Sequence, residues 1–453
     1  MENFFKGGKT TLILFLIFVF LSFSNKTLSQ NSSSNDTTLT LSQCIDYALK
    51  HQPSLQQSLI NIDITKTTNK INLSGWLPQA YLTGTLTHYL ELPTVFIKNS
   101  SGQTVEQKSG VVNTAVPVLS VSQTIFNPSL LFASRSANLY VKQAEQVTDS
   151  TKIFLVSAVS KAFYSLLLTL EQINVFKEDT ARLNKNLSDT YHQYVAGTVD
   201  ETDYDEAAIS LNNSKAQLKQ ATENIVPQYA ILKQVMGFAP ERQFNVSFDT
   251  LQMMNDIAFD TTRQLQYDNR IEFQQLQTTK RLQQEVTAYY RSAFLPTVSA
   301  VFNYTPEFQN NSFPSLFSSV YPSSYIGLSV SIPLFTGFAR LENVHKSQLE
   351  ERVLYWGEVD LKSQIYTDYT TSLANYKSNL YNYEIMKDNE DKAKKVYGIV
   401  SLQYAQGVVA YLNVITAESN LITSEIGYVN ALFQLLSSKI DLEKSMGYIS
   451  YNR

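Results

Sequence analysis

The sequence contains few of the residues on which enzymes, metal sites and disulfide-stabilised folds depend. Its 453 residues include one cysteine, Cys44, and four histidines. A single cysteine cannot form an internal disulfide, and we expect Cys44 to be a small packed residue. The histidines lack metal-ligand spacing, so no metal site is predicted. The chain also lacks a G-x-G-x-x-G loop, an H-E-x-x-H pair and a nucleophile elbow, so neither a cofactor nor an enzyme activity is expected.

The chain has no excess of positive charge, and one long stretch of it contains no proline. The chain has 36 Lys and Arg against 40 Asp and Glu, a net charge of -4. Because binding to nucleic acid calls for a basic stripe, nucleic acid is not an expected partner. Proline is absent between Gly337 and Tyr404, which predicts a helix on the order of 100 Å long at a rise of 1.5 Å per residue. Tyr and Phe at helical spacing are interpreted as packing residues.

What the chain does contain is a plan that occurs twice. The segment Ser120–Phe126 resembles Ser329–Phe335 at an offset of 209. Tyr194-x-x-Gly197 matches Tyr404-x-x-Gly407 at an offset of 210, and Met236-Gly237 matches Met446-Gly447 at the same offset. Landmarks that keep one offset over more than a hundred residues indicate internal duplication.

The apolar periodicity divides the chain into two repeats with flanking segments. Each repeat is predicted to hold a half-length helix, a β-hairpin, a long helix and a second half-length helix, so the expected fold class is mainly α with a membrane β part. The predicted segments are a signal peptide 1–29, a linker 30–41, a first repeat 42–237 (half helix, hairpin 77–126, long helix 129–195, half helix 203–236), an inset 238–261, a second repeat 262–447 (half helix, hairpin 295–335, long helix 338–405, half helix 413–446) and a C-terminal tail 448–453.

The predicted strands each have one apolar face and one polar face. Ile326, Leu328 and Val330 alternate with small or polar residues, the period-2 pattern of a strand. The hairpin arms have about the 9–11 residues that a tilted strand needs to cross a bilayer. Four strands leave two open edges, which lipid does not tolerate; three chains would give about 12 strands and an open duct. The alternative is a soluble four-stranded sheet beside a helical bundle.

These features resemble the TolC family of outer-membrane efflux proteins. The resemblance rests on the duplicated plan, on the Leu-Pro strand openings at Leu77 and Leu295, and on the Tyr404-x-x-Gly407 turn followed by Leu412, Val414 and Ala417. It implies a homotrimer whose 12-stranded barrel lies in outer-membrane lipid and continues into a periplasmic α-helical barrel. It also implies docking onto a periplasmic membrane-fusion adaptor and an inner-membrane pump or ABC exporter.

The candidate functional residues lie at the two turns between long and half helices. The turn glycines are Gly197 and Gly407, and the residues expected at a periplasmic aperture are Asp200, Asp203, Glu206, Tyr404, Asn413 and Thr416. A ring of carboxylates at a constriction would favour cations, whereas the simpler interpretation is that these carboxylates complement a helix dipole. The resemblance implies acidic residues at the second turn, where this chain has Asn413 and Thr416. Asp203 and Tyr404 are predicted to hold the aperture shut.

The function expected from these features is passive exit of drugs or small metabolites through a tripartite efflux system. Within the same fold, type I protein secretion and metal-ion efflux are alternatives. A periplasmic coiled-coil protein without a pore is an alternative from a different class.

Overall fold

The computed structural model describes residues 38–247 and 257–450. Contacts divide the chain into one unit of Leu39–Arg242 with Val246–Arg453 and a second of Met1–Thr38 with Gln243–Asn245. The helices and long strands given below all lie in the first, larger unit. The predicted signal peptide, part of the predicted linker, residues 248–256 of the inset and residues 451–453 of the tail lie outside the described residues.

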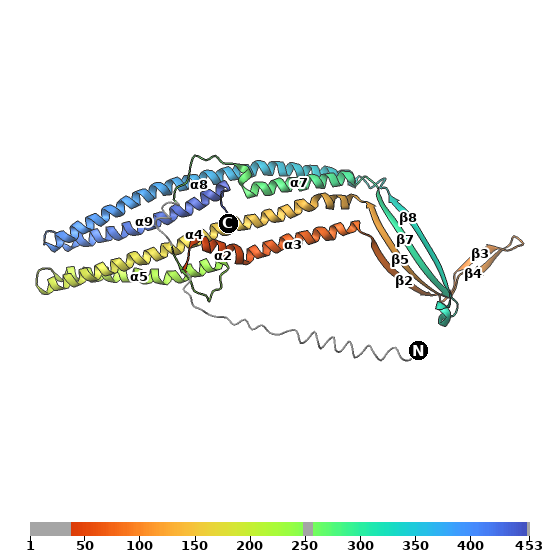
Figure 1. Cartoon of the computed structure of the whole chain (residues 1–453), viewed down its shortest axis with the longest axis horizontal. Helices are drawn as coiled ribbons and strands as arrows, with labels where there is room; N and C mark the ends of the chain where they lie inside the picture. The colour runs from red at the N-terminus through yellow and green to blue at the C-terminus, as the bar shows by residue number, and fades with distance from the viewer. Residues whose placement is uncertain (1–37, 248–256, 451–453) are drawn as a thin grey trace. The chain divides into compact units, whose positions relative to one another are not determined.

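Two similar series of elements follow one another in this unit (Figure 1). The long helices have 68 and 67 residues and the half helices after them have 36 each, so the predicted duplication is present. The first series is α2 Leu41–His51, α3 Pro53–Leu73, β2 Gln79–His88, β3 Thr94–Lys98, β4 Thr104–Lys108, β5 Asn113–Phe126, α4 Pro128–Val195 and α5 Glu201–Met236; the second is α7 Ile271–Ser292, β7 Thr297–Asn310, β8 Val320–Ser331, α8 Ala339–Ala405 and α9 Tyr411–Met446. The described residues also include three 3-10 turns (Ser74–Trp76, Tyr267–Asn269 and Phe313–Ser318) and the two-residue strands β1 Thr38–Leu39 and β6 Asn245–Val246.

The four long strands form one antiparallel sheet in the order β2-β5-β7-β8. Its register places side chains of one kind in rows across the strands, because opposed residues point to the same face. One row is apolar and consists of Ala80, Val121, Phe302 and Ile326; the next row is polar and consists of Tyr81, Ser120, Asn303 and Tyr325. Within the polar row, the Ser120 hydroxyl donates to Asn303, whose amide donates to the Tyr325 hydroxyl at 2.6 Å. The sheet therefore has one apolar and one polar face.

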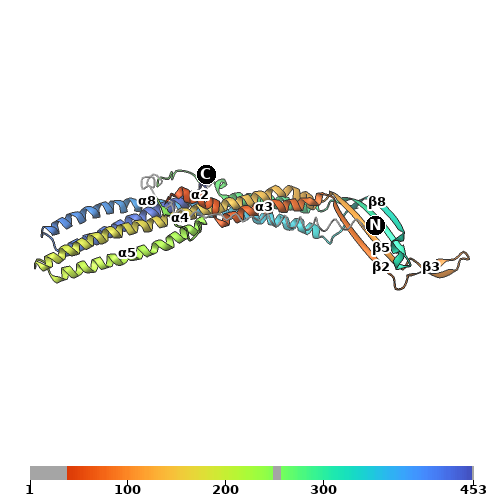
Figure 2. The ribbon, with the colours of Figure 1, turned by 60° about the horizontal axis from the view of Figure 1, so that its bottom comes forward.

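The helices pack side by side beyond the sheet, as both views show (Figures 1 and 2). Near the strands α4 contacts α3 and α7, and α7 contacts α8. Near the turns α4 contacts α5 and α9, and α9 contacts α8. One window of α4 is long and apolar enough to cross a membrane, but 61% of it is buried against other parts of the protein. This segment is therefore the core of the helical layer.

Several predicted boundaries are wrong, each for a local reason. The helix expected over 42–75 breaks at Gln52, whose ψ of 121° is extended, because the following Pro53 has no N–H to continue the ladder. The half helix expected from residue 262 begins at Ile271, since Asp260 accepts hydrogen bonds from Thr262 and forms a turn instead.

The predicted hairpins also differ from the observed ones. The second was expected to reach residue 335, but β8 ends at Ser331, two residues before Pro333. In the first, the arms are joined by an additional hairpin of β3 and β4 where a polar connection was expected. Both strands are exposed along their whole length. Because neither strand has a buried face, their sequences lack the alternation of apolar and polar residues by which a strand is predicted.

Candidate functional site at the paired helix turns

The two turns have the same backbone geometry. Gly197 has a φ of 71° and Gly407 a φ of 73°, a left-handed conformation that favours glycine. In each turn the glycine N–H donates to the carbonyl of the tyrosine three residues earlier, at 2.9 Å, and the next residue donates to the carbonyl five residues back, at 2.9 Å. Each hydrogen-bond pair closes the C-terminus of a long helix and returns the chain into a half helix.

The predicted aperture residues fall into two groups. Asp200, Asp203 and Tyr404 line a groove of about 480 Å³ between the two turns, together with the turn glycines. Asp200 occupies the N-cap position of α5 and Asp203 its first turn, where a negative charge complements the helix dipole. Outside this groove, Glu206, Asn413 and Thr416 are exposed. The Thr416 hydroxyl donates back to the Leu412 carbonyl at 2.8 Å.

Tyr404 joins the two repeats directly. Its hydroxyl donates to the Gln193 side-chain oxygen at 2.6 Å, which links α8 to α4. Burial, with a smaller contribution from Asp203, raises the pKa of Tyr404, so the phenol stays protonated and remains a donor. The ring of Tyr404 also packs at 5.4 Å against that of Tyr411.

An apolar cluster lies immediately above the turns. Ala207 of α5 and Tyr411 and Val414 of α9 are buried in it. Leu187 of α4 and Tyr397 of α8 pack against it. All four helices at this end are therefore held around a common core.

A buried ionic cluster lies further along the same helices and was not predicted. Arg182 of α4 is close to three carboxylates whose side chains are buried: Asp179 of α4, and Glu418 and Glu425 of α9. Arg182 thus lies within 4 Å of all three acids. The sequence does place two acids, Glu418 and Glu425, seven residues apart on an otherwise apolar face of α9. Their partner on α4 could not be identified from this spacing, because it is more than 200 residues away.

Burial and mutual repulsion dominate the electrostatics of this cluster. Desolvation, together with the Asp179 charge, raises the pKa of Glu418 to about 7 despite the attraction of Arg182. Desolvation also raises the pKa of Asp179 and of Glu425. The Glu418 carboxyl accepts a hydrogen bond of 3.0 Å from the Asn186 amide, and Asp179 accepts one from the Ser214 hydroxyl of α5.

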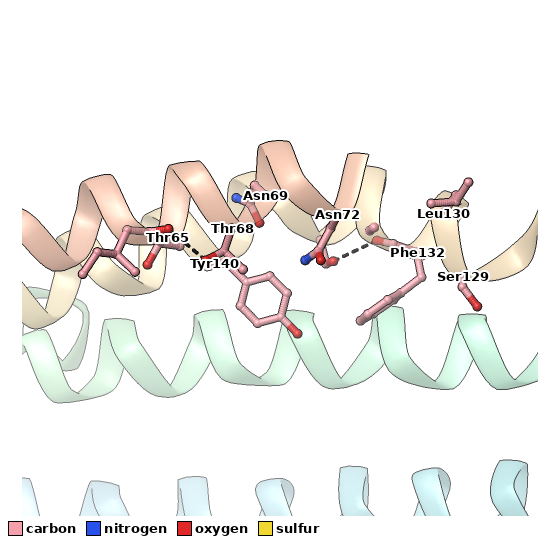
Figure 3. Close-up of a pocket in the computed structure, with 11 residues that line it drawn as sticks. Thr65, Thr68, Asn69, Asn72, Ser129, Leu130, Phe132 and Tyr140 are labelled. Atoms are coloured by element: carbon pink, nitrogen blue, oxygen red, sulfur yellow. Dashed lines mark hydrogen bonds between the residues drawn. The ribbon is translucent and has the colours of Figure 1, made fainter. Parts of the chain in front are cut away.

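A second pocket, of about 530 Å³, lies between α3 and α4 near the sheet (Figure 3). Its lining is mainly apolar, with the Phe132 and Tyr140 rings projecting from α4, and α3 contributes Thr68 and Asn69. It contains no carboxylate, histidine, cysteine, lysine or arginine, so it offers no acid–base or metal chemistry. Within residues 38–247 and 257–450, no group of three or more His, Cys, Asp or Glu residues is placed to hold a metal ion.

A sheet with one apolar and one polar face, joined to paired helices that meet at two turns, is the architecture of a channel-forming membrane protein. The chain belongs to the outer membrane efflux protein family, whose model matches residues 44–238 and 264–448. It is an outer-membrane efflux channel protein, in a family of channels rather than enzymes, and its helices extend into the periplasm.

Solved structures of similar fold are also outer-membrane proteins. The outer membrane protein VceC of Vibrio cholerae matches with a TM-score of 0.71 at 15% identity, covering 90% of this chain and 96% of that chain. The CmeC outer membrane channel of Campylobacter jejuni matches with a TM-score of 0.69 at 17% identity, covering 91% and 87%. The MtrE outer membrane channel of Neisseria gonorrhoeae, in its open state, matches with a TM-score of 0.69 at 17% identity, covering 90% and 88%. A comparison with curated proteins found no match.

The predicted fold class is confirmed by these similarities. The fold is that of the trimeric channels in which a β-barrel continues into a helical barrel. The four strands do not close within one chain.

Proposed function

We propose that the chain is the passive exit duct of a three-part efflux system, which releases drugs or small metabolites delivered by a periplasmic adaptor and an inner-membrane pump. The observation that carries this proposal is the sheet, whose β2 and β8 edges have no partner strand in the described part of the chain. Unpaired backbone groups are costly in lipid. Three copies joined edge to edge would remove the open edges and form a barrel of about 12 strands, wide enough for an aqueous duct.

The two faces of the sheet support this assembly. The apolar row through Phe302 and Ile326 fits lipid, and the polar row through Asn303 and Tyr325 fits a water-filled interior. Ile326 is 82% exposed in the single chain. Contact with the lipid of a bilayer would account for the exposure of this large apolar side chain. A periplasmic coiled-coil protein would have no use for such a face.

We further propose that the two turns form the periplasmic aperture, with Asp200 and Asp203 facing the passage. The hydrogen bond between Tyr404 and Gln193 would hold the two helix pairs together there. Glu206, Asn413 and Thr416 lie outside the groove, so we assign them to the exposed surface of the helices. No step in this function calls for catalysis by the chain.

The proposal is tested by purification and reconstitution of the mature chain. We expect a heat-modifiable trimer from outer-membrane fractions, single-channel currents in planar bilayers, and restored efflux of a dye in a strain that lacks this chain but keeps its adaptor and pump. Asp203→Ala should change the current of the closed state, because it removes a carboxylate from the proposed constriction. A soluble monomer without channel activity would refute the proposal.

A further inference from the structure

The contacts between α4 and α9 form a seam between the two repeats, because α4 pairs with α5 and α9 pairs with α8. Lys161 pairs with Asp441 at 2.5 Å, and the Gln172 amide donates to Asn430 at 3.2 Å. Nearer the turns, Arg182 donates to Glu425 at 3.3 Å. Any movement of one helix pair away from the other must break these contacts.

The Arg182 contacts differ from the rest of the seam in being buried and unbalanced. The Asp179 side chain is fully buried and that of Glu418 is 3% exposed, whereas the side chains of Lys161 and Asp441 are 39% and 45% exposed. The Arg182 guanidinium lies 3.6 Å from Asp179 and 3.8 Å from Glu418. One oxygen of each of these carboxylates, and the Nε of Arg182, has no hydrogen-bond partner.

We propose that this cluster is a latch between the helix pair α4/α5 and the helix pair α8/α9, and that protonation of Glu418 sets whether the latch stays closed. The proposal rests on the proposed function, because it concerns the state of the channel. A protonated Glu418 leaves Arg182 to Asp179 and Glu425 and removes one buried negative charge. An ionised Glu418 leaves three carboxylates with buried side chains around one guanidinium, which favours separation of the pairs.

The charged and titratable groups around Glu418 come from α4, α8 and α9. On its own helix, α9, Glu425 faces Arg182, and the Tyr411 phenol interacts with the Glu418 charge. Besides Asp179 and Arg182, α4 contributes the exposed Glu178, which is 4.0 Å from the guanidinium. From α8 come Tyr397, whose ring is 6.0 Å from Arg182, and the ion pair of Lys394 with Glu390 at 2.7 Å, in which the Lys394 charge also attracts Glu425.

The remaining neighbours are uncharged and give the site access to protons. Asn186 of α4 and Ser214 of α5 donate to the carboxylates. A polar cavity of about 350 Å³ between α5 and α9 is bordered by Asp179, Ser214 and Glu418. Both acids border this cavity, so solvent that enters it would reach them.

The sign of the pH dependence follows from the burial of Glu418. Its pKa is about 7 in the closed cluster and would return toward 4.5 once the cluster is hydrated. A group whose pKa is raised in one state stabilises that state below its ordinary pKa, and this stabilisation is lost as the pH rises through the raised value. The closed seam is therefore favoured near pH 5 and loosened near pH 8.

The second repeat does not carry an equivalent cluster. At the offset of 210, Arg182 corresponds to Lys392, while Glu418 and Glu425 correspond to Ala208 and Lys215. A seam built from the corresponding faces of α8 and α5 would thus lack the buried acids. The latch belongs to the seam between the two repeats of one chain.

The test is the single-channel current of the reconstituted full-length mature protein between pH 5.5 and 8.5. We expect the open fraction of the wild type to rise several-fold across pH 7. Glu418→Gln, which fixes the neutral form, should stay at the low-pH level throughout. The matched control is Glu223→Gln, the same change at a side chain of α5 that is 63% exposed, and it should follow the wild type.

A wild type that conducts with no pH dependence, or a Glu418→Gln variant that keeps it, would overturn the latch while leaving the channel function intact. Arg182→Met removes the cation that the three acids share and should raise the open fraction at pH 8.5, where Glu418 is ionised. If that variant does not assemble, the comparison of Glu418→Gln with Glu223→Gln still shows whether the pH dependence of the current arises from Glu418. Failure of the wild type to restore dye efflux in cells would instead refute the proposed function.

Discussion

The half helices α5 and α9 both end at a glycine that lies against another segment of backbone. Gly447, with a φ of 74°, is the residue after α9; a Cβ there would lie 2.4 Å from the Asn269 carbonyl oxygen. Real Cβ contacts do not come that close, and the obstacle is backbone rather than a flexible side chain. Gly237 after α5 repeats the arrangement, with a Cβ 2.8 Å from the His51 oxygen.

This geometry predicts that Gly447→Ala is more destabilising than an equivalent change in open space. Gly407 supplies the control, because its φ of 73° is almost the same and a Cβ there would meet nothing within 4 Å. Gly407→Ala should cost only the left-handed backbone penalty, about 1–2 kcal/mol. Gly447→Ala adds an overpacking cost of about 1–3 kcal/mol on top of this penalty.

Thermal unfolding followed by far-ultraviolet circular dichroism, with oligomer dissociation on gels as a second readout, measures the difference. The Gly447→Ala protein should melt below the Gly407→Ala protein, which should in turn melt below the wild type. Equal melting temperatures for the two variants would show that the contact at Asn269 relaxes without cost, and that the close packing at this joint does not limit stability.

Three further predictions follow from single contacts. Leu328→Lys, on the apolar face of β8 and 70% exposed in one chain, should lose about 2–4 kcal/mol if it lies near the bilayer midplane and should assemble poorly in outer membranes, whereas Ser329→Lys on the polar face should assemble normally. Tyr404→Phe removes the hydrogen bond to Gln193, a net contribution of about 0.5–1.5 kcal/mol, and should raise the closed-state leak current; an unchanged leak would exclude this bond from the aperture. Cys44 is fully buried and burial raises the pKa of its thiol to about 12, so maleimide should label it only after unfolding, and rapid labelling of the native protein would contradict its placement.

Much of the fold was accessible from the sequence because its elements are long and periodic. The helices around Phe163 and Tyr376 carry apolar stripes many turns in length, and their ends are marked by Pro128, Gly197 and Gly407. Such signals accumulate over dozens of residues. Boundaries that depend on one local competition were missed, as at Pro53, where a single proline divides an otherwise helical stretch.

The functional residues were harder to predict, because they are defined by contacts between repeats. A groove shared by Asp203 and Tyr404 was not predicted, although the turn glycines, Asp203 and Tyr404 were each named as candidates beside the turns. The partner of Tyr404, Gln193, was not, since any polar residue near the end of α4 could have filled that role. The cluster around Arg182 needs the register of α4 against α9, and nothing in the pattern of either helix fixes that register alone.

The duplication gives the channel two kinds of helix seam. Within one chain, α4 and α9 are joined by Arg182 with Glu418 and Glu425. If copies of the chain close into a ring, α8 of one copy meets α5 of the next, and there the corresponding positions are occupied by Lys392, Ala208 and Lys215, which cannot form a buried acid cluster. The two seams must therefore respond differently to pH and to salt, and since an exposed contact is screened more strongly than a buried one, added salt should loosen the seam between copies before the seam within a copy.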